Sequence, residues 1–147
     1  MRNCLIILLM LAVFSGCAGK TETTLYDYKT AYIGDNSKVS HIVGAMQYPK
    51  GAKCETIKIQ SEKEPYGLTV YLSGAGIPDA ASYQKNALMC FALIGNLEEI
   101  KYQNSESGAV LAEFSRTKMD QEQRQNGQKT SEEIGKSKES FEAFQKL

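Results

Sequence analysis

Hydrophobic residues after residue 25 follow two periodicities, and the first is that of α-helices. Apolar side chains recur at i, i+3, i+4 and i+7 after a turn-prone glycine and a polar capping run, Gly34 to Ser37, which predicts a helix over residues 37–47. A second stretch, 80–95, follows Asp79 and is apolar over a wide arc, so we expect it to be the central, most buried helix. The apolar positions are Val39, Ile42, Val43 and Met46 in the first helix, and Ala80, Tyr83, Ala87, Leu88, Phe91 and Ile94 in the second.

The second periodicity is the two-residue alternation of half-buried β-strands. Residues 54–60 and 68–73 alternate in this way, and Pro65 stands in the turn between them, so they predict a β-hairpin. Residues 97–104 and 109–115 predict a second hairpin around the turn NSESG. The positions expected to face the core are Ile57, Ile59, Leu68, Val70, Leu72, Ile100, Tyr102, Val110, Ala112 and Phe114.

The last thirty residues are more polar. Residues 116–136 are rich in Gln, Lys and Glu, and we expect a short frayed helix near 116–124 followed by a loop at Asn126-Gly127. A final helix should begin after the cap Ser137 and dock on the domain through Phe141, Phe144 and Leu147, which share one helical face.

This order of elements predicts an α+β fold. Helix, hairpin, helix, hairpin and helix follow one another, and a four-stranded, mostly antiparallel sheet with helices packed on one face would bury the apolar stripes. The other face, with Lys58, Thr69, Tyr71 and Lys101, should be wetter and available to a partner. We assign residues 26–147 to this single domain.

The start of the chain has the pattern of an export signal. Arg2 precedes an apolar block of eleven residues, Cys4 to Phe14, which fits a signal peptide and is too short for a membrane-spanning helix. Ser15, Gly16 and Cys17 follow, and the stretch resembles a bacterial lipobox, although Phe14 stands where Leu, Val or Ile is usual. We therefore expect a signal peptide over 1–16, lipidation of Cys17, and a short polar tether over 17–25. The expected location is the extracytoplasmic face of a bacterial cell membrane.

The charge balance limits which partners are plausible, and the cysteine content limits which disulfide is possible. The chain has 17 basic and 17 acidic residues, a balance that argues against a nucleic-acid partner, which would call for a basic face. After loss of Cys4 and acylation of Cys17, Cys54 and Cys90 remain. Outside the cytoplasm they could form a disulfide, or they could be two small buried hydrophobes.

Catalytic and metal motifs give no support for an enzyme. CxxC, HxxxH and GxSxG spacings are absent from the sequence, and the single histidine, His41, lies off the apolar stripe of its helix. We assign no catalytic residue, metal or cofactor. Tyr32, Tyr66 and Tyr71 could line a surface for protein or glycan contact, or could simply pack against the sheet.

A family resemblance adds to these predictions. Residues 32–39, YIGDNSKV, with EPYGL at 64–68 and the helical stretch 87–94, resemble the bacterial domain of unknown function DUF4825, and the tail after Phe114 is similar to that family's ending. The resemblance covers residues 26–147. It implies a non-enzymatic module outside the membrane, found in small lipoproteins and as an appendage of membrane sensors.

Function thus has a leading hypothesis and two alternatives. The leading one is a membrane-anchored cell-surface lipoprotein with a binding or sensing domain, whose partner could be a membrane sensor ectodomain or an envelope component. One alternative is an envelope hydrolase with an unrecognised carboxylate or cysteine site. The other is a module that occupies a partner's groove by strand addition.

Overall fold

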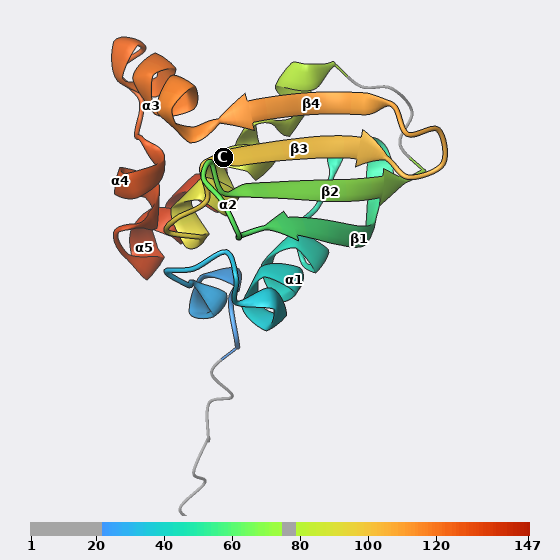
Figure 1. Cartoon of the computed structure of the whole chain (residues 1–147). Helices are drawn as coiled ribbons and strands as arrows, with labels where there is room; N and C mark the ends of the chain where they lie inside the picture. The colour runs from blue at the N-terminus through green and yellow to red at the C-terminus, as the bar shows by residue number, and fades with distance from the viewer. Residues whose placement is uncertain (1–21, 75–78) are drawn as a thin grey trace, which may run out of the picture.

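Four strands form the β-sheet of the computed structural model, which describes residues 22–74 and 79–147 (Figure 1). In sheet order they are β1 (Lys53–Gln60), β2 (Gly67–Ser73), β3 (Glu99–Asn104) and β4 (Val110–Ser115). The outer pairs, β1 with β2 and β3 with β4, are antiparallel, whereas the central strands β2 and β3 run parallel. The sheet is therefore mixed, because the helix between β2 and β3 carries the chain back to the end of the sheet where β2 begins.

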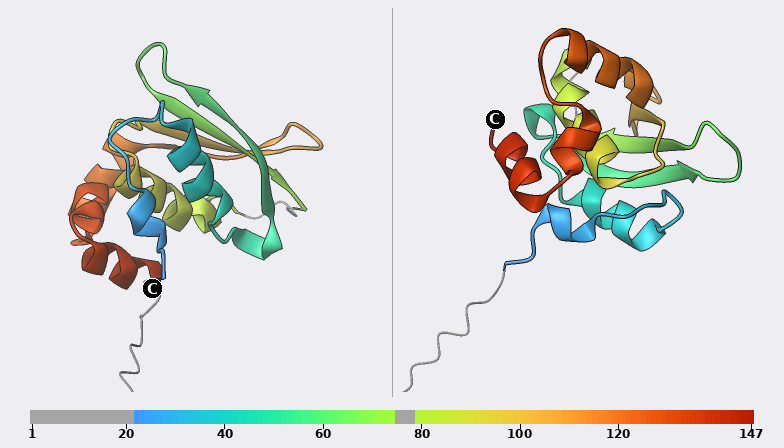
Figure 2. Two further views of the ribbon diagram at one scale, coloured as in Figure 1. Left: turned by 90° about the horizontal axis from the view of Figure 1, so that it is seen from below. Right: turned by 90° about the vertical axis from the view of Figure 1, so that its left-hand side faces the viewer.

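The sheet and five α-helices of the described residues make an α+β fold. The helices are α1 (Asn36–Gly44), α2 (Gln84–Leu93), α3 (Arg116–Gln125), α4 (Ser131–Gly135) and α5 (Lys138–Gln145). Figure 2 shows α1 and α2 on one face of the sheet, with α4 and α5 behind α2 on the side away from the strands. Every residue from 86 to 93 is buried, so the expectation that this helix is the most buried one is confirmed.

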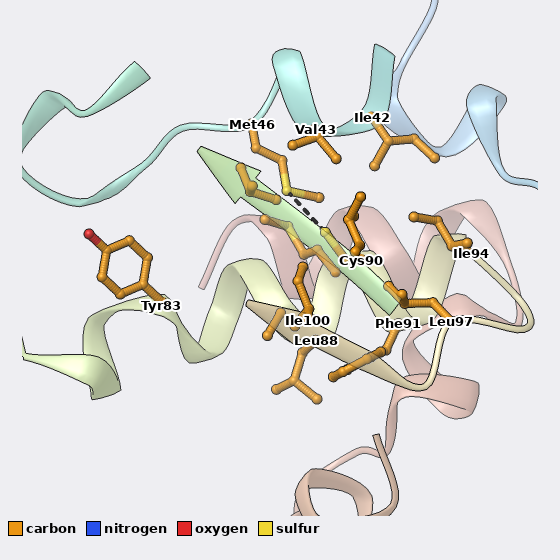
Figure 3. Close-up of a cluster of buried hydrophobic side chains, with 14 of the residues drawn as sticks. Ile42, Val43, Met46, Tyr83, Leu88, Cys90, Phe91, Ile94, Leu97 and Ile100 are labelled. Atoms are coloured by element: carbon orange, nitrogen blue, oxygen red, sulfur yellow. Dashed lines mark hydrogen bonds between the residues drawn. The ribbon is translucent and has the colours of Figure 1, made fainter. Parts of the chain in front are cut away.

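The first helix begins and ends slightly before its predicted limits. The Asp35 carboxylate caps it by accepting a hydrogen bond from the Lys38 backbone N–H at 3.3 Å. The regular helix ends at Gly44, yet the chain continues to turn, and Met46 still reaches the core at 8% exposure. The predicted stripe of Val39, Ile42, Val43 and Met46 is therefore buried as expected, together with the side chains of Figure 3.

Strand register explains one wrong prediction in the second hairpin. Tyr102 lies opposite Ala112, but its neighbour Gln103 lies opposite Val110, so the pairing shifts by one residue between them. A shift of this kind moves a side chain to the other face of the sheet. Val110, expected in the core, is 54% exposed, and Leu111 is buried beside Ala112 instead.

The C-terminal region contains a short helix, α4, that was not predicted; it lies between the predicted loop at Asn126-Gly127 and the predicted final helix. Thr130 and Glu133 form a capping box in which each side chain accepts from the other residue's backbone N–H, and this starts α4. Ile134, the one large apolar residue of α4, is completely buried. Gly135 then lies so close to α2 that a Cβ atom there would collide with the Ala92 carbonyl oxygen.

The last predicted face is only partly correct. Phe141 is fully buried and lies 5.9 Å, between ring centroids, from Tyr26 in the short 3-10 helix η1 (Leu25–Tyr28). Phe144 packs at the edge of the core, whereas Leu147 is 92% exposed and does not dock. Leu147 follows the end of α5, so its side chain no longer continues the stripe that Phe141 begins.

Arg116 ties this C-terminal region to the segment between α2 and β3. Its guanidinium donates to the carbonyl oxygens of Ile94 and Leu97 at 2.7 and 2.6 Å and to the Ser131 hydroxyl at 3.2 Å. Ser131 in turn donates to the buried Asp120 carboxylate, through its backbone N–H at 2.7 Å and its hydroxyl at 2.9 Å. These bonds satisfy the polar groups that the tail buries against the domain.

The described chain enters on the helical side of the molecule. η1 packs beside α5, where the Lys138 ammonium lies 3.1 Å from the Asp27 carboxylate. In both views of Figure 2, η1 lies on the side of the domain opposite the uncovered face of the sheet. The signal segment 1–16 and the predicted lipidation site Cys17 lie outside the described residues.

Candidate functional site

The face of the sheet turned away from α1 and α2 carries polar side chains from all four strands. Cross-strand pairing brings them into rows: Lys58 lies beside Thr69, Thr69 beside Lys101, and Lys101 beside Glu113. Apart from the register shifts in β1 and β4, their side chains alternate with those of the core face, as the sequence predicted for Lys58, Thr69, Tyr71 and Lys101. We call this surface the open face; it consists of Thr56, Lys58, Gln60, Gly67, Thr69, Tyr71, Glu99, Lys101, Gln103, Val110, Glu113 and Ser115.

One end of the open face is hollowed, and most of the charged side chains of this face line the hollow. The hollow has a volume of about 640 Å³ and lies where β2 and β3 begin, β4 ends and α3 starts. Five ionisable side chains line it, with hydroxyl and amide groups between them. Gly67 lies between Gln60 and Glu99, its partners on the neighbouring strands. The polar and charged side chains of the lining are Lys58, Gln60, Thr69, Glu99, Lys101, Glu113, Ser115 and Lys118.

Gly67 leaves the floor of the hollow without a side chain. Its backbone is not in the left-handed region, and a Cβ atom there would meet only the Gln60 Cβ at 3.8 Å and the Glu99 carbonyl oxygen at 3.9 Å. Both are ordinary van der Waals distances, so neither backbone conformation nor packing requires glycine at this position. Gly67 is the first residue of β2 and is paired on both sides, with Gln60 and Glu99. A glycine in a paired strand position often marks a place where another molecule approaches the backbone.

One ion pair already joins two of the charges. The Lys101 ammonium lies 2.5 Å from a Glu113 carboxylate oxygen across the β3–β4 pair. The hydrogen bond to Glu113 raises the pKa of Lys101, and the nearby Tyr71 and Glu99 act in the same direction. Lys58 and Lys118 take part in none of the ion pairs formed by the described residues.

The three tyrosines chosen from the sequence do not converge on this hollow. Tyr71 lies on the open face but beyond the hollow, and Tyr66 is half-buried just before β2, where its N–H donates to the Glu98 carboxylate at 2.9 Å. Tyr32 is 70% exposed in the loop that precedes α1. They therefore do not form one shared surface with the lysines.

The two cysteines lie toward the core and are free thiols in the structure. Cys90 is fully buried in α2 with its sulfur 3.8 Å from that of Met46 (Figure 3). Burial raises the pKa of the Cys90 thiol to about 12, and burial together with Glu55 raises that of Cys54. A thiol with a raised pKa is a poor nucleophile, so these side chains are suited to packing rather than chemistry. A bond between them stays a prediction.

Other candidate chemistry is sparse in the described part of the chain. His41 is exposed and stacks on the Tyr28 ring with 3.7 Å between centroids. Within residues 22–74 and 79–147, no group of three His, Cys, Asp or Glu side chains is placed to hold a metal ion. No helix in those ranges has the length and apolar character needed to cross a bilayer.

The family model of a domain of unknown function, DUF4825, matches residues 25–117. The chain belongs to this family. No curated protein and no solved structure matches the chain. The DUF4825 match spans the sheet, α1 and α2 and ends within the first turn of α3, so it includes all of the hollow except Lys118. The tail after residue 117, for which the sequence also indicated a resemblance, lies outside the match.

The sequence predicted about a third of the polar and charged residues that line this site. Strand alternation placed Lys58, Thr69 and Lys101 on one face, but Gly67 and Lys118 were not singled out. The signal for Gly67 is a glycine directly before an alternating strand, a pattern that is equally typical of a turn. Lys118 can be added only once α3 is known to start at the end of β4.

Proposed function

We propose that this DUF4825 protein is a lipid-anchored protein of the bacterial cell surface whose domain binds a partner through the open face and catalyses no reaction. The observation that carries the binding role is the hollow around Gly67, a position at which glycine serves neither the backbone nor the packing. The anchor is inferred from the signal-like residues 1–16 and from Cys17.

The position of the N-terminal region supports this arrangement. From Cys17 to Leu25 the chain spans eight residues, which can reach at most about 28 Å when fully extended. η1 lies on the helical side, so the attachment through Cys17 starts from that side and leaves the open face free (Figure 2). A surface so placed is accessible to a sensor ectodomain or to another envelope component.

The composition of the hollow favours binding over hydrolysis. Its two carboxylates are Glu99 and Glu113, and Glu113 is engaged with Lys101. A glycosidase needs one carboxylic acid and one free carboxylate facing each other across the substrate. Here both side chains project from neighbouring strands in the same direction, which suits recognition of a ligand laid over the sheet.

The anchor is tested by metabolic labelling with a palmitate analogue and by cell fractionation. We expect the wild-type protein to carry the label and to remain with the membrane, and Cys17→Ala to lose the label. Cys54→Ala is the matched control and should stay labelled. Label retained in Cys17→Ala at the same stoichiometry would contradict the anchor.

The non-enzymatic role is tested separately with the purified full chain. Peptidoglycan fragments and a set of peptides are incubated with wild-type protein and with Glu99→Gln/Glu113→Gln. We expect no turnover by either protein. Cleavage by the wild type that the double variant loses would establish the hydrolase alternative.

A further inference from the structure

The distribution of charge in the hollow indicates what kind of partner would fit. Lys101 and Glu113 largely neutralise each other, which leaves Lys58 at the β1 side, Lys118 at the α3 side and Glu99 between them. Neighbouring strands are about 4.8 Å apart, so the β1 and β4 sides of the hollow are separated by roughly 14 Å. The free charges thus follow the order positive, negative, positive across the strands.

A uniformly negative polymer matches this order poorly. It would place negative charge over Glu99 and beside Glu113, where like charges repel. A polypeptide can supply both signs, and its amide groups can bond to the Thr69 and Ser115 hydroxyls and the Gln60 amide. Gly67 provides room for a main chain to lie close to the sheet.

We propose that the hollow binds an extended polypeptide segment that crosses the strands and carries two acidic residues about four positions apart with a basic residue between them. The spacing follows from the rise of an extended chain, about 3.4 Å per residue, over the roughly 14 Å between the two sides of the hollow. One acidic residue meets Lys58, the other meets Lys118, and the basic residue meets Glu99. This assignment rests on the proposed binding role of the open face.

The test is NMR titration of the full chain, isotope-labelled and held in lipid nanodiscs, with three probes. The first probe is the peptide GSESKSESG, the second is the charge-swapped peptide GSKSESKSG, and the third is polyphosphate. We expect the first peptide to shift the amide signals of Gly67, Thr69 and Ser115, and the other two probes to bind at least tenfold more weakly.

Variants separate specific binding from general attraction between charges. Lys58→Gln and Lys118→Gln should each weaken the first peptide about two- to fivefold, as expected for solvent-exposed ion pairs. Gly67→Val should weaken it at least tenfold by filling the floor, and Lys146→Gln, on the exposed end of α5, should leave it unchanged. Equal binding of both peptides, stronger binding of polyphosphate, or shifts confined to the helical side would overturn the proposal.

This experiment can fail without the binding role failing. In-cell cross-linking from the open face, described below, reports whether any partner lies there. Cross-links lost in Gly67→Val, together with no response to the first peptide, would overturn the ligand class alone. No cross-links from the open face would overturn the binding role itself.

Discussion

The two faces of the same sheet obey different constraints. On the core face, Leu68, Val70 and Leu72 are at most 2% exposed and pack against helices, so their size and shape are fixed by their neighbours. On the open face, Lys58, Thr69 and Lys101 contact solvent, and the fold would tolerate many other residues there. Residues on the open face that the fold does not require, above all Gly67, are therefore the positions at which we propose binding.

The largest predicted difference between the faces is in stability. Leu72→Ala removes a completely buried side chain and should lower the free energy of unfolding by about 2–5 kcal/mol. Thr69→Ala, on the open face of the same strand, should change it by about 0.5 kcal/mol or less. Denaturant unfolding measures the free energy for both variants, and a similar loss in the two would contradict the distinction between a packed core face and a tolerant open face.

The next effect concerns the contact of the C-terminal helices with α2. Gly135→Ala drives a methyl group into the Ala92 carbonyl and should cost about 1–3 kcal/mol. Gly44→Ala is the matched control, because a Cβ atom at Gly44 would meet no atom within 4 Å and alanine favours the helix, so it should be neutral or stabilising by up to about 1 kcal/mol. An equal cost at both glycines would show that the close approach of α4 to α2 is wrong.

A substitution at Gly67 should have opposite effects on stability and on binding. Gly67→Ala fits its surroundings and should raise the free energy of unfolding by about 0.5–1 kcal/mol while it weakens binding. Thermal unfolding followed by circular dichroism measures the first effect, and peptide titration measures the second. A destabilised variant would mean that the backbone needs glycine there.

The smallest effect is a pH dependence on the helical side. The Thr24 backbone N–H, followed by Lys138, lowers the pKa of Asp27 below 3.8, and Thr130 lowers that of Glu133 below 4.5. Because both carboxylates have lower pKa values folded than unfolded, their stabilisation is present above about pH 4.5 and is lost as the pH falls through the folded values. Asp27→Asn should flatten this acid dependence in urea unfolding, and an unaltered slope in Asp27→Asn would contradict the assignment.

Much of the fold could be predicted from local sequence patterns, but the parts that depend on pairing between distant segments could not. The stripes of α1 and α2 and the alternation of β1 and β2 identified the helices and strands, because each buries several apolar residues at regular spacing. α4 was not predicted because Ile134 is its one large apolar residue, although the sequence contains the Thr130–Glu133 pattern of a capping box. The parallel pairing of β2 with β3 depends on how α2 returns the chain, which no local spacing expresses.

The candidate site was harder to predict for the same reason. Alternation shows that Lys58 and Lys101 share a face, but the register decides that Thr69 lies between them. Lys118 joins the hollow only through the direct succession of β4 and α3. The role proposed for Gly67 depends on the space around it, since an added Cβ atom would meet no atom closer than 3.8 Å, and only the three-dimensional structure shows this.

The central claim, that the open face is the binding surface, is tested most directly by photo-cross-linking in living cells. A photoreactive amino acid is placed at Gln60, at the β1 side of the lining of the hollow, or at Lys146, on the helical side, with and without Gly67→Val. We predict cross-links to a protein from position 60 that Gly67→Val abolishes at equal protein level, and none from position 146 that depend on Gly67. Cross-links from position 60 that persist in Gly67→Val, or partner cross-links found at position 146 alone, would contradict the claim.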